Sequence, residues 1–142
     1  MMSRGAARSD FLAALIGAPW SWRDHNCWDF AAHVQRHLFC RELPAIAVPV
    51  DLSQRWVLRT IETHPARHGW REIPPGAFDT ILARDGALVL MAHRRLAAHI
   101  GVWLLPEARI IHCSDPHGVV CETALALRQM GWRHLTFFEP KT

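Results

Sequence analysis

The first half of the chain carries apolar residues at the spacing of amphipathic helices. From Cys27 to Phe39 apolar positions recur every three or four residues, while Gln35 and Arg36 fall on the opposite side. This period is typical of a helix with one buried face. Capping residues, Gly and Pro delimit further helices. The pattern therefore predicts helices at about residues 9–16, 27–39 and 51–63.

The second half carries short apolar runs separated by turn residues, as strands do. These runs predict strands at residues 87–91, 98–103, 109–113, 119–122 and 134–138. A short helix is expected at about 123–130, ended by Gly131, because glycine is favoured just past a helix end. Helices followed by antiparallel strands indicate an α+β domain, with N-terminal helices packed on a C-terminal antiparallel sheet.

The composition fits one globular domain that spans residues 1–142. Half of the residues are hydrophobic and 20% are charged, which excludes a disordered chain. The net charge of +3 is spread along the chain, so we expect a solvated basic surface and no nucleic-acid partner. The apolar segment 11–18 follows Arg4 and Arg8, but Asp10 interrupts it. We therefore expect neither a cleaved signal peptide nor a membrane span.

Cys27 occupies the predicted start of the second helix. The unpaired N–H groups and the positive dipole end of a helix start favour the thiolate, which is the nucleophilic form of cysteine. The same N–H groups can stabilise an oxyanion. We therefore expect Cys27 to be alkylated before Cys40, Cys113 and Cys121. The alternative is that Cys27 is a small buried core residue.

Two histidines, His99 and His112, interrupt apolar strands that are joined by a short link. If the loop is residues 104–107, closed by Trp103 and Ala108, the two histidines are directly opposed. Directly opposed side chains have Cβ atoms about 5 Å apart. We therefore expect both rings on one sheet face, directed towards the thiol as a base and the residue that orients it. The alternative is a pair of structural histidines.

Aromatic and polar residues close to Cys27 in the sequence are candidates for substrate contacts. Trp20 and Trp22 can line a groove, because aromatic walls suit sugars and peptides. His25 is a candidate acid or substrate contact. Core packing of the tryptophans and an exposed loop position for His25 are the alternatives. Asp115, in a predicted turn, is the alternative to His112 as the orienting residue.

A zinc site is the main rival to thiol chemistry. His33 and His37 have the spacing of two ligands on one helix face, but they lack the Glu of the metalloprotease motif. The four cysteines contain no CxxC pair, which is the usual spacing of structural zinc sites. We therefore expect no metal and no cofactor.

Six short motifs, in order, resemble the NlpC-type cell-wall cysteine peptidases, a papain-like family, over roughly residues 11–138. The similarity is nearest to the phage-tail and prophage branch. The motifs are Gly17-Ala-Pro19-Trp20-Ser-Trp22, Asn26-Cys27-Trp28, Leu43-Pro44, Gly86-Ala-Leu-Val-Leu-Met91, His99-Ile-Gly-Val-Trp103 and Ile111-His112-Cys113. Asn26, Trp20 and Ala87 replace the Asp, Tyr and Asp of the family pattern. The rim of the site, and with it the substrate, is therefore expected to differ.

The resemblance implies a papain-like fold and a hydrolase with a Cys-His-His triad. Cys27 would attack an amide carbonyl, His99 would act as the base, and His112 would orient His99. The implied substrate is a peptidoglycan stem peptide, cut without a metal or a cofactor.

Two further function classes remain open. One is a thiol acyltransferase or hydrolase that acts on a lipid or small amide with the same fold. The other is a non-enzymatic structural component of a phage tail. We expect a cytoplasmic or phage-particle-associated protein, with a phage-tail or secretion component as a possible partner.

Overall fold

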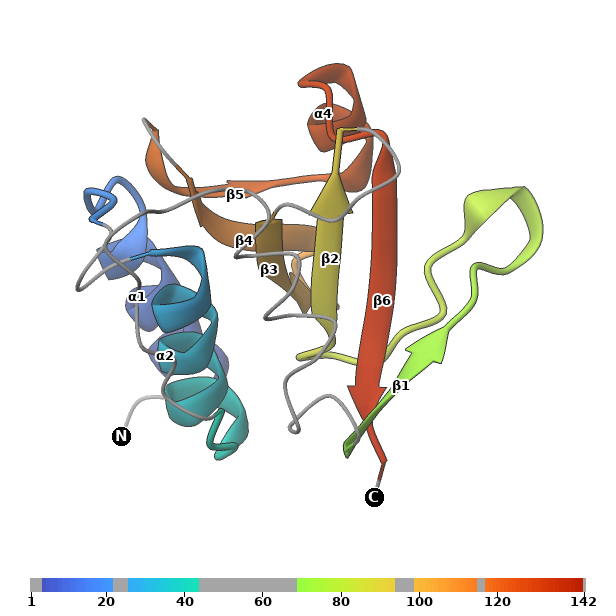
Figure 1. Cartoon of the computed structure of the whole chain (residues 1–142). Helices are drawn as coiled ribbons and strands as arrows, with labels where there is room; N and C mark the ends of the chain where they lie inside the picture. The colour runs from blue at the N-terminus through green and yellow to red at the C-terminus, as the bar shows by residue number, and fades with distance from the viewer. Residues whose placement is uncertain (1–3, 22–25, 44–68, 94–98, 115–116, 142) are drawn as a thin grey trace.

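A computed structural model of the chain describes residues 4–21, 26–43, 69–93, 99–114 and 117–141 (Figure 1). Its elements follow the expected order of helices first and strands afterwards. They are α1 (Arg4–Leu15), α2 (Cys27–Phe39), β1 (Trp70–Ile73), the 3₁₀ turn η2 (Ala77–Asp79), β2 (Leu88–Ala92), β3 (His99–Leu104), β4 (Arg109–Ser114), β5 (Gly118–Glu122), α4 (Ala124–Gln129) and β6 (His134–Pro140).

The strands form one six-stranded sheet in the order β1-β6-β2-β3-β4-β5. All of its pairings are antiparallel. Because side chains alternate across a strand, the sheet has two apolar faces. On one face Ile100, Val102 and Ile111 pack with Phe30 and Val34 of α2; we call it the α2 face. On the other face the core contains Leu127 of α4; we call it the α4 face.

The α4 face buries a second cluster of apolar side chains beneath the short helix α4. The sheet residues that pack with Leu127 are Val89, Met91, Trp103, Ile110 and Phe137. The helix begins at Thr123, whose Oγ1 accepts the N–H of Ala126 at 3.1 Å. It is followed by Gly131 at a φ of +104°, the left-handed conformation that glycine adopts without strain. The predicted strand-rich half is thus covered on both faces.

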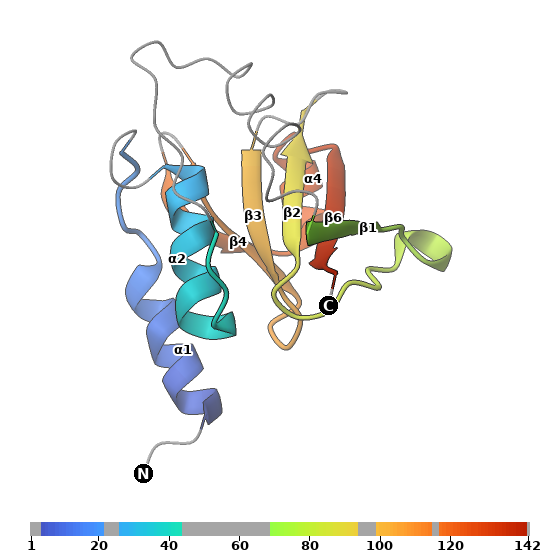
Figure 2. The same cartoon turned by 60° about the horizontal axis from the view of Figure 1, so that its bottom comes forward.

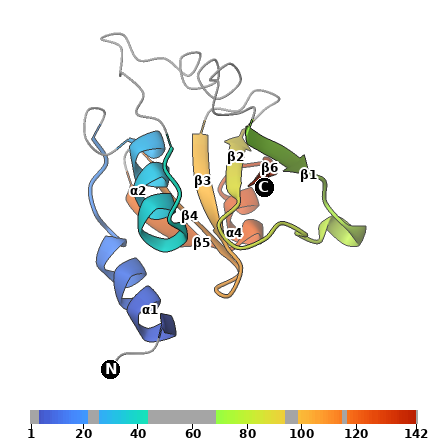
Figure 3. The same cartoon turned by 90° about the horizontal axis from the view of Figure 1, so that it is seen from below.

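The helices α1 and α2 lie side by side on the α2 face, as Figures 1 and 3 show. Phe11 of α1 stacks on His33 and His37 of α2, with ring centroids 5.7 and 5.5 Å away. The two imidazole centroids are 4.4 Å apart. These histidines therefore contribute to helix–helix packing.

Arg8 connects α1 to two turns at one end of the central strands, the turn before β2 and the turn between β3 and β4. Its guanidinium donates to both carboxylate oxygens of Asp85, at 2.6 and 2.9 Å, and to both of Glu107, at 3.0 and 2.9 Å. Asp85 Oδ1 also accepts the backbone N–H of Leu105 at 2.9 Å. Bidentate arginine–carboxylate pairs fix orientation as well as adding energy. This cluster therefore holds α1 against the turn that joins β3 and β4.

Several sequence expectations need correction. The helix α1 begins at Arg4 instead of Ser9 or Asp10, and β1 was not predicted. Gln35, expected on the solvent side of α2, is buried and donates from Nε2 to the carbonyl of Gly86 at 2.7 Å. The helix expected at 51–63 lies outside the described residues. Among the described helices, none is long and apolar enough to cross a bilayer.

Candidate functional site

Cys27 is the first residue of α2, as predicted. The helix begins there because Asn26 caps it: Asn26 Oδ1 accepts the backbone N–H of Asp29 at 2.9 Å. Such a cap satisfies one of the unpaired donors at a helix start. The N–H groups of Cys27 and Trp28 remain close enough to the sulfur to lower the pKa of its thiol.

Burial favours the neutral thiol of Cys27 over the thiolate that the helix start is expected to stabilise. Burial raises its pKa to about 12, because a charged sulfur would lose its hydration. The backbone N–H of Ile100, together with those of the helix start, opposes this shift but does not offset it. The side chain is 7% exposed and belongs to the core of the α2 face. Desolvation therefore outweighs the helix dipole.

The two predicted histidines lie together. Nε2 of His99 and Nδ1 of His112 are 2.8 Å apart, and the rings meet edge to face with centroids 4.8 Å apart. Both side chains are buried. The predicted juxtaposition is therefore confirmed.

The predicted register between the two strands is wrong by two residues. The ladder pairs Val102 with Ile111 and Leu104 with Arg109, so the loop is residues 105–108. Continuing that ladder would set His112 opposite Gly101, with His99 diagonal to it. Since side-chain direction has a period of two, a shift by two residues keeps both rings on one face.

The two rings also lie on a different face of the sheet from the one expected, which was the face that carries Cys27. His99 and Gly101 alternate with Ile100 and Val102 of the α2 face, so His99 points to the α4 face. Its ring stacks on Trp132, which packs against the α4-face core, with centroids 5.1 Å apart. Cys27 and the histidines therefore approach the hairpin from opposite faces.

They do so at the same end of the hairpin. In Figure 2, α2 and β3 both begin at the top of the view. Among the described residues, the β3–β4 ladder does not continue past Val102 and Ile111. The backbone N–H of Ile100, next to His99 in the chain, favours the thiolate of Cys27. The thiol thus lies against the stretch of β3 that carries the imidazole and has no ladder partner on β4.

Both histidines are neutral at pH 7. Burial lowers the pKa of His112 to about 4 and lowers the pKa of His99 well below 6.5. The nearby His112 lowers the pKa of His99 further. A buried imidazole resists protonation because the cation loses its hydration.

Each ring of the pair has one nitrogen without a partner among the described residues. Nε2 of His112 is buried and makes no hydrogen bond. Nδ1 of His99 likewise makes no hydrogen bond with another described residue. If His99 donates from Nε2 to His112, its Nδ1 is a bare acceptor and the remaining proton of His112 sits on the unpartnered Nε2. That arrangement leaves one nitrogen of His99 ready to take a proton.

Trp132, which the sequence analysis missed, covers His99. Its ring stacks on His99 and also on His93, with the His93 centroid 3.9 Å away. Nδ1 of His93 lies 2.8 Å from the carbonyl oxygen of Gly131. The turn at Gly131 therefore aims Trp132 at the pair. The sequence predicted that a helix ends at Gly131, but nothing in it indicated that the next residue, Trp132, packs on His99.

The other predicted site residues are placed as follows. Trp20 is half-buried and packs against the same core cluster as Cys27. Trp22, His25 and Asp115 lie outside the described residues. Within the described part of the chain, no three His, Cys, Asp or Glu side chains converge as metal ligands.

A scan against models of known protein families finds no match, and no curated protein matches the chain.

Proposed function

We propose that the protein is a cysteine hydrolase that cleaves an amide bond, with Cys27 as nucleophile, His99 as base and His112 as the residue that orients His99. The observation that carries the proposal is the 2.8 Å hydrogen bond between His99 Nε2 and His112 Nδ1. It fixes one imidazole through a second one and leaves the other nitrogen of His99 without a partner among the described residues. This is the relationship between base and orienting group in catalytic triads.

A buried pair of this kind is costly to keep for stability alone. An unpartnered buried nitrogen forfeits roughly 1–3 kcal/mol of hydration, and His112 carries such a nitrogen at 1% exposure. An apolar pair would fill the same place in the sheet without that cost. The cost supports a role for the pair in chemistry.

The proposed reaction starts from the neutral thiol and the neutral imidazole. Cys27 and His99 lie on opposite faces of β3, so the transfer has to pass round the start of this strand, where the Cys27 thiol contacts the backbone of Ile100. In the proposed step, Nδ1 of His99 takes the proton of Cys27 there as the sulfur attacks the amide carbonyl carbon, and the backbone N–H groups at the start of α2 stabilise the resulting oxyanion. The imidazolium then gives its proton to the leaving amine as the C–N bond breaks, which forms a thioester. Water attacks the thioester while His99 takes its proton, and the acid and the free thiol are released.

The proposed substrate class is the stem peptide of peptidoglycan. This part of the proposal rests on the resemblance of the six sequence motifs to NlpC-type peptidases. A papain-like fold and association with a phage particle belong to the same proposal. The antiparallel sheet, with α2 packed on β3 and β4, is compatible with it.

The test is incubation of the purified protein with defined muropeptides, with products identified by mass. We expect two product fragments whose masses sum to that of the substrate plus one water, as hydrolysis of one amide bond requires. Cys27→Ser and His99→Ala should abolish turnover, and His112→Ala should reduce it at least about tenfold but leave it measurable, because the base and the helix-start donors remain. Phe11→Leu, which alters only helix packing, is the control. Turnover that survives Cys27→Ser would refute the proposal.

A further inference from the structure

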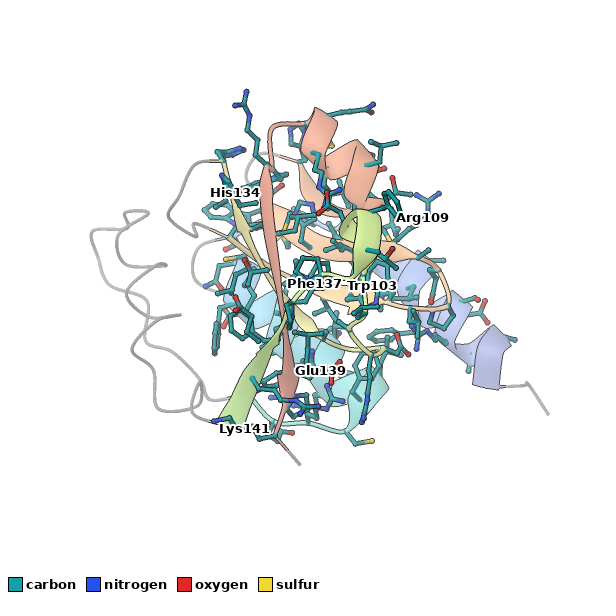
Figure 4. All side chains as sticks on the ribbon, turned by 90° about the vertical axis from the view of Figure 1, so that its right-hand side faces the viewer. Trp103, Arg109, His134, Phe137, Glu139 and Lys141 are labelled. Carbon is teal, nitrogen blue, oxygen red and sulfur yellow. The ribbon has the colours of Figure 1, made fainter. Side chains whose placement is uncertain are left out.

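A cavity of about 510 Å³ lies between β1, β6, the turn η2 and the end of α4. Its volume falls in the range of small-ligand pockets. Apolar side chains of β6, including Leu135 and Phe137, line it from the α4 face, and Trp103 packs edge-on against Phe137 with centroids 5.9 Å apart (Figure 4). The side of the pocket formed by Phe137 is therefore held in place by packing against Trp103.

The walls carry charges of both signs. The cavity is lined by two basic residues, Arg128 and Arg133, and by two acidic residues, Glu72 and Asp79. None of these four side chains forms an ion pair or hydrogen bond with another described residue. These charged groups do not pair with each other, so they remain able to form charge-assisted hydrogen bonds with a ligand.

The wall that carries Asp79 adopts an unfavourable backbone conformation. Phe78 and Asp79 have φ values of +57° and +60°, although neither is glycine, and such residues seldom occur in this region. Phe78 is fully exposed, so packing of its side chain does not explain the conformation. In Figure 1 this segment, drawn yellow-green, projects away from the sheet beyond β1. Strained backbone of this kind clusters at ligand sites.

The cavity shares a sheet face with the histidine pair. Leu135 is paired with Met91, and Met91 is paired with His99. Adjacent strands are about 4.8 Å apart, so the backbone of Leu135 lies roughly 10 Å from that of His99.

We propose that this pocket binds free di- and tripeptides. The carboxylate end would pair with Arg128 and Arg133, and the ammonium end with Glu72 and Asp79. An extended peptide spans about 3.3–3.6 Å per residue, so two or three residues separate their end groups by about 7–11 Å. Because the unlike charges line one cavity without pairing with each other, a ligand with separated charged ends can meet both kinds. The proposal does not depend on the thiol chemistry.

The test is calorimetric titration of the full chain with trialanine, N-acetyl-trialanine and trialanine amide. We expect trialanine to bind at least tenfold more tightly than either blocked form, since each blocked form lacks one charged end. Arg133→Gln should remove the preference for the free carboxylate, and Asp79→Asn the preference for the free ammonium. Both substitutions are at exposed side chains and should leave the circular dichroism spectrum unchanged.

Lys141→Gln is the matched control, because Lys141 lies at the opposite end of β6 from His134 and does not line the cavity (Figure 4). It should leave all three affinities unchanged. Cys27→Ala should also bind as the parent does, which separates this proposal from the proposed hydrolysis. Absence of trialanine binding at millimolar concentration, or equal affinity for free and blocked peptides, would overturn it.

Discussion

His99 and His112 lie within hydrogen-bonding distance although the β3–β4 ladder does not set them opposite each other. Their diagonal relationship brings one ring edge against the other. Within the part of the chain that the structure describes, Nε2 of His112 and Nδ1 of His99 then have no partner. Diagonal neighbours across a strand pair are within reach of long or aromatic side chains. The contact between the two histidines therefore depends on the length and orientation of their rings as well as on the strand register.

Removing one histidine should cost more than removing both. His99→Phe or His112→Phe alone leaves the partner with an unsatisfied buried nitrogen, which should lower the free energy of unfolding by about 1–3 kcal/mol. In the double variant that penalty disappears, so a coupling energy of at least about 1 kcal/mol is expected. Urea unfolding of the four proteins measures it. Strictly additive losses would contradict a mutual hydrogen bond.

The histidines should also make the fold sensitive to mild acid. Their folded pKa values lie below 6.5, with that of His112 at about 4, so the unfolded chain binds more protons between these limits. Stability from this source is complete above pH 6.5 and is lost as pH falls towards 4. For His112 the full effect is about 3 kcal/mol.

Urea unfolding across pH 4–8 checks this expectation. His112→Phe should remove much of the slope, because the substituted side chain does not titrate. Arg36→Gln, at an exposed ion pair with Glu42 on α2, serves as the control and should keep the slope. A parent protein equally stable at pH 4.5 and 7 would show that the pair titrates normally.

Thiol labelling should follow exposure and not helix position. Cys40 is the exposed cysteine at the end of α2, whereas burial raises the pKa of Cys27 to about 12 and that of Cys113 to about 11. Iodoacetamide at pH 8 should therefore modify Cys40 first and Cys27 at least about tenfold more slowly. This order reverses the one expected from the sequence.

Peptide mass mapping over a time course measures the order of labelling. In Cys40→Ser, the fast phase should vanish while the slow phases remain. If Cys27 is the first to react in both proteins, its thiol is activated by the histidines in the resting state.

Gly101 should tolerate no side chain. A Cβ there would lie 2.9 Å from Cγ2 of Ile110 and 3.2 Å from Cβ of His112. We expect Gly101→Ala to destabilise the fold by about 1–3 kcal/mol through overpacking, with His112 displaced.

Gly69→Ala is the comparison, since a Cβ at Gly69 meets nothing within 4 Å. It should change stability by less than about 0.5 kcal/mol. Thermal unfolding of both variants, together with the imidazole proton signals of His99, checks the prediction. Equal effects of the two substitutions would count against close packing at Gly101.

The sequence predicted α2 with its observed bounds because its apolar period and the capping residue Asn26 agree. It misplaced the β3–β4 loop by one residue because Ala108 takes a φ of +53°. A left-handed backbone conformation is usually adopted by glycine or asparagine, so an alanine does not indicate one in the sequence. The edge strand β1 was missed because its four residues carry no alternating pattern.

The sequence predicted that His99 and His112 lie together, but it did not predict which face of the sheet carries them. The spacing of His99 and His112 indicated a pair, since an error of two residues preserves the face. Which face receives Cys27 depends on how α2 packs across the sheet, and that is set by contacts between segments distant in the sequence. The stacking of Trp132 on His99 has the same origin. Burial of Cys27, which reverses the expected shift of its pKa, follows from this packing as well.

The Arg8 cluster has a consequence for the order in which the chain assembles. The partners of Arg8, Asp85 and Glu107, follow it in the chain by 77 and 99 positions. The ion pairs of α1 can therefore form only once the turn between β3 and β4 has been made, whereas Phe11 of α1 can pack on α2 well before that. Contacts of such long range slow folding. The polar anchoring of α1 is therefore expected to form later in folding than its apolar contacts with α2.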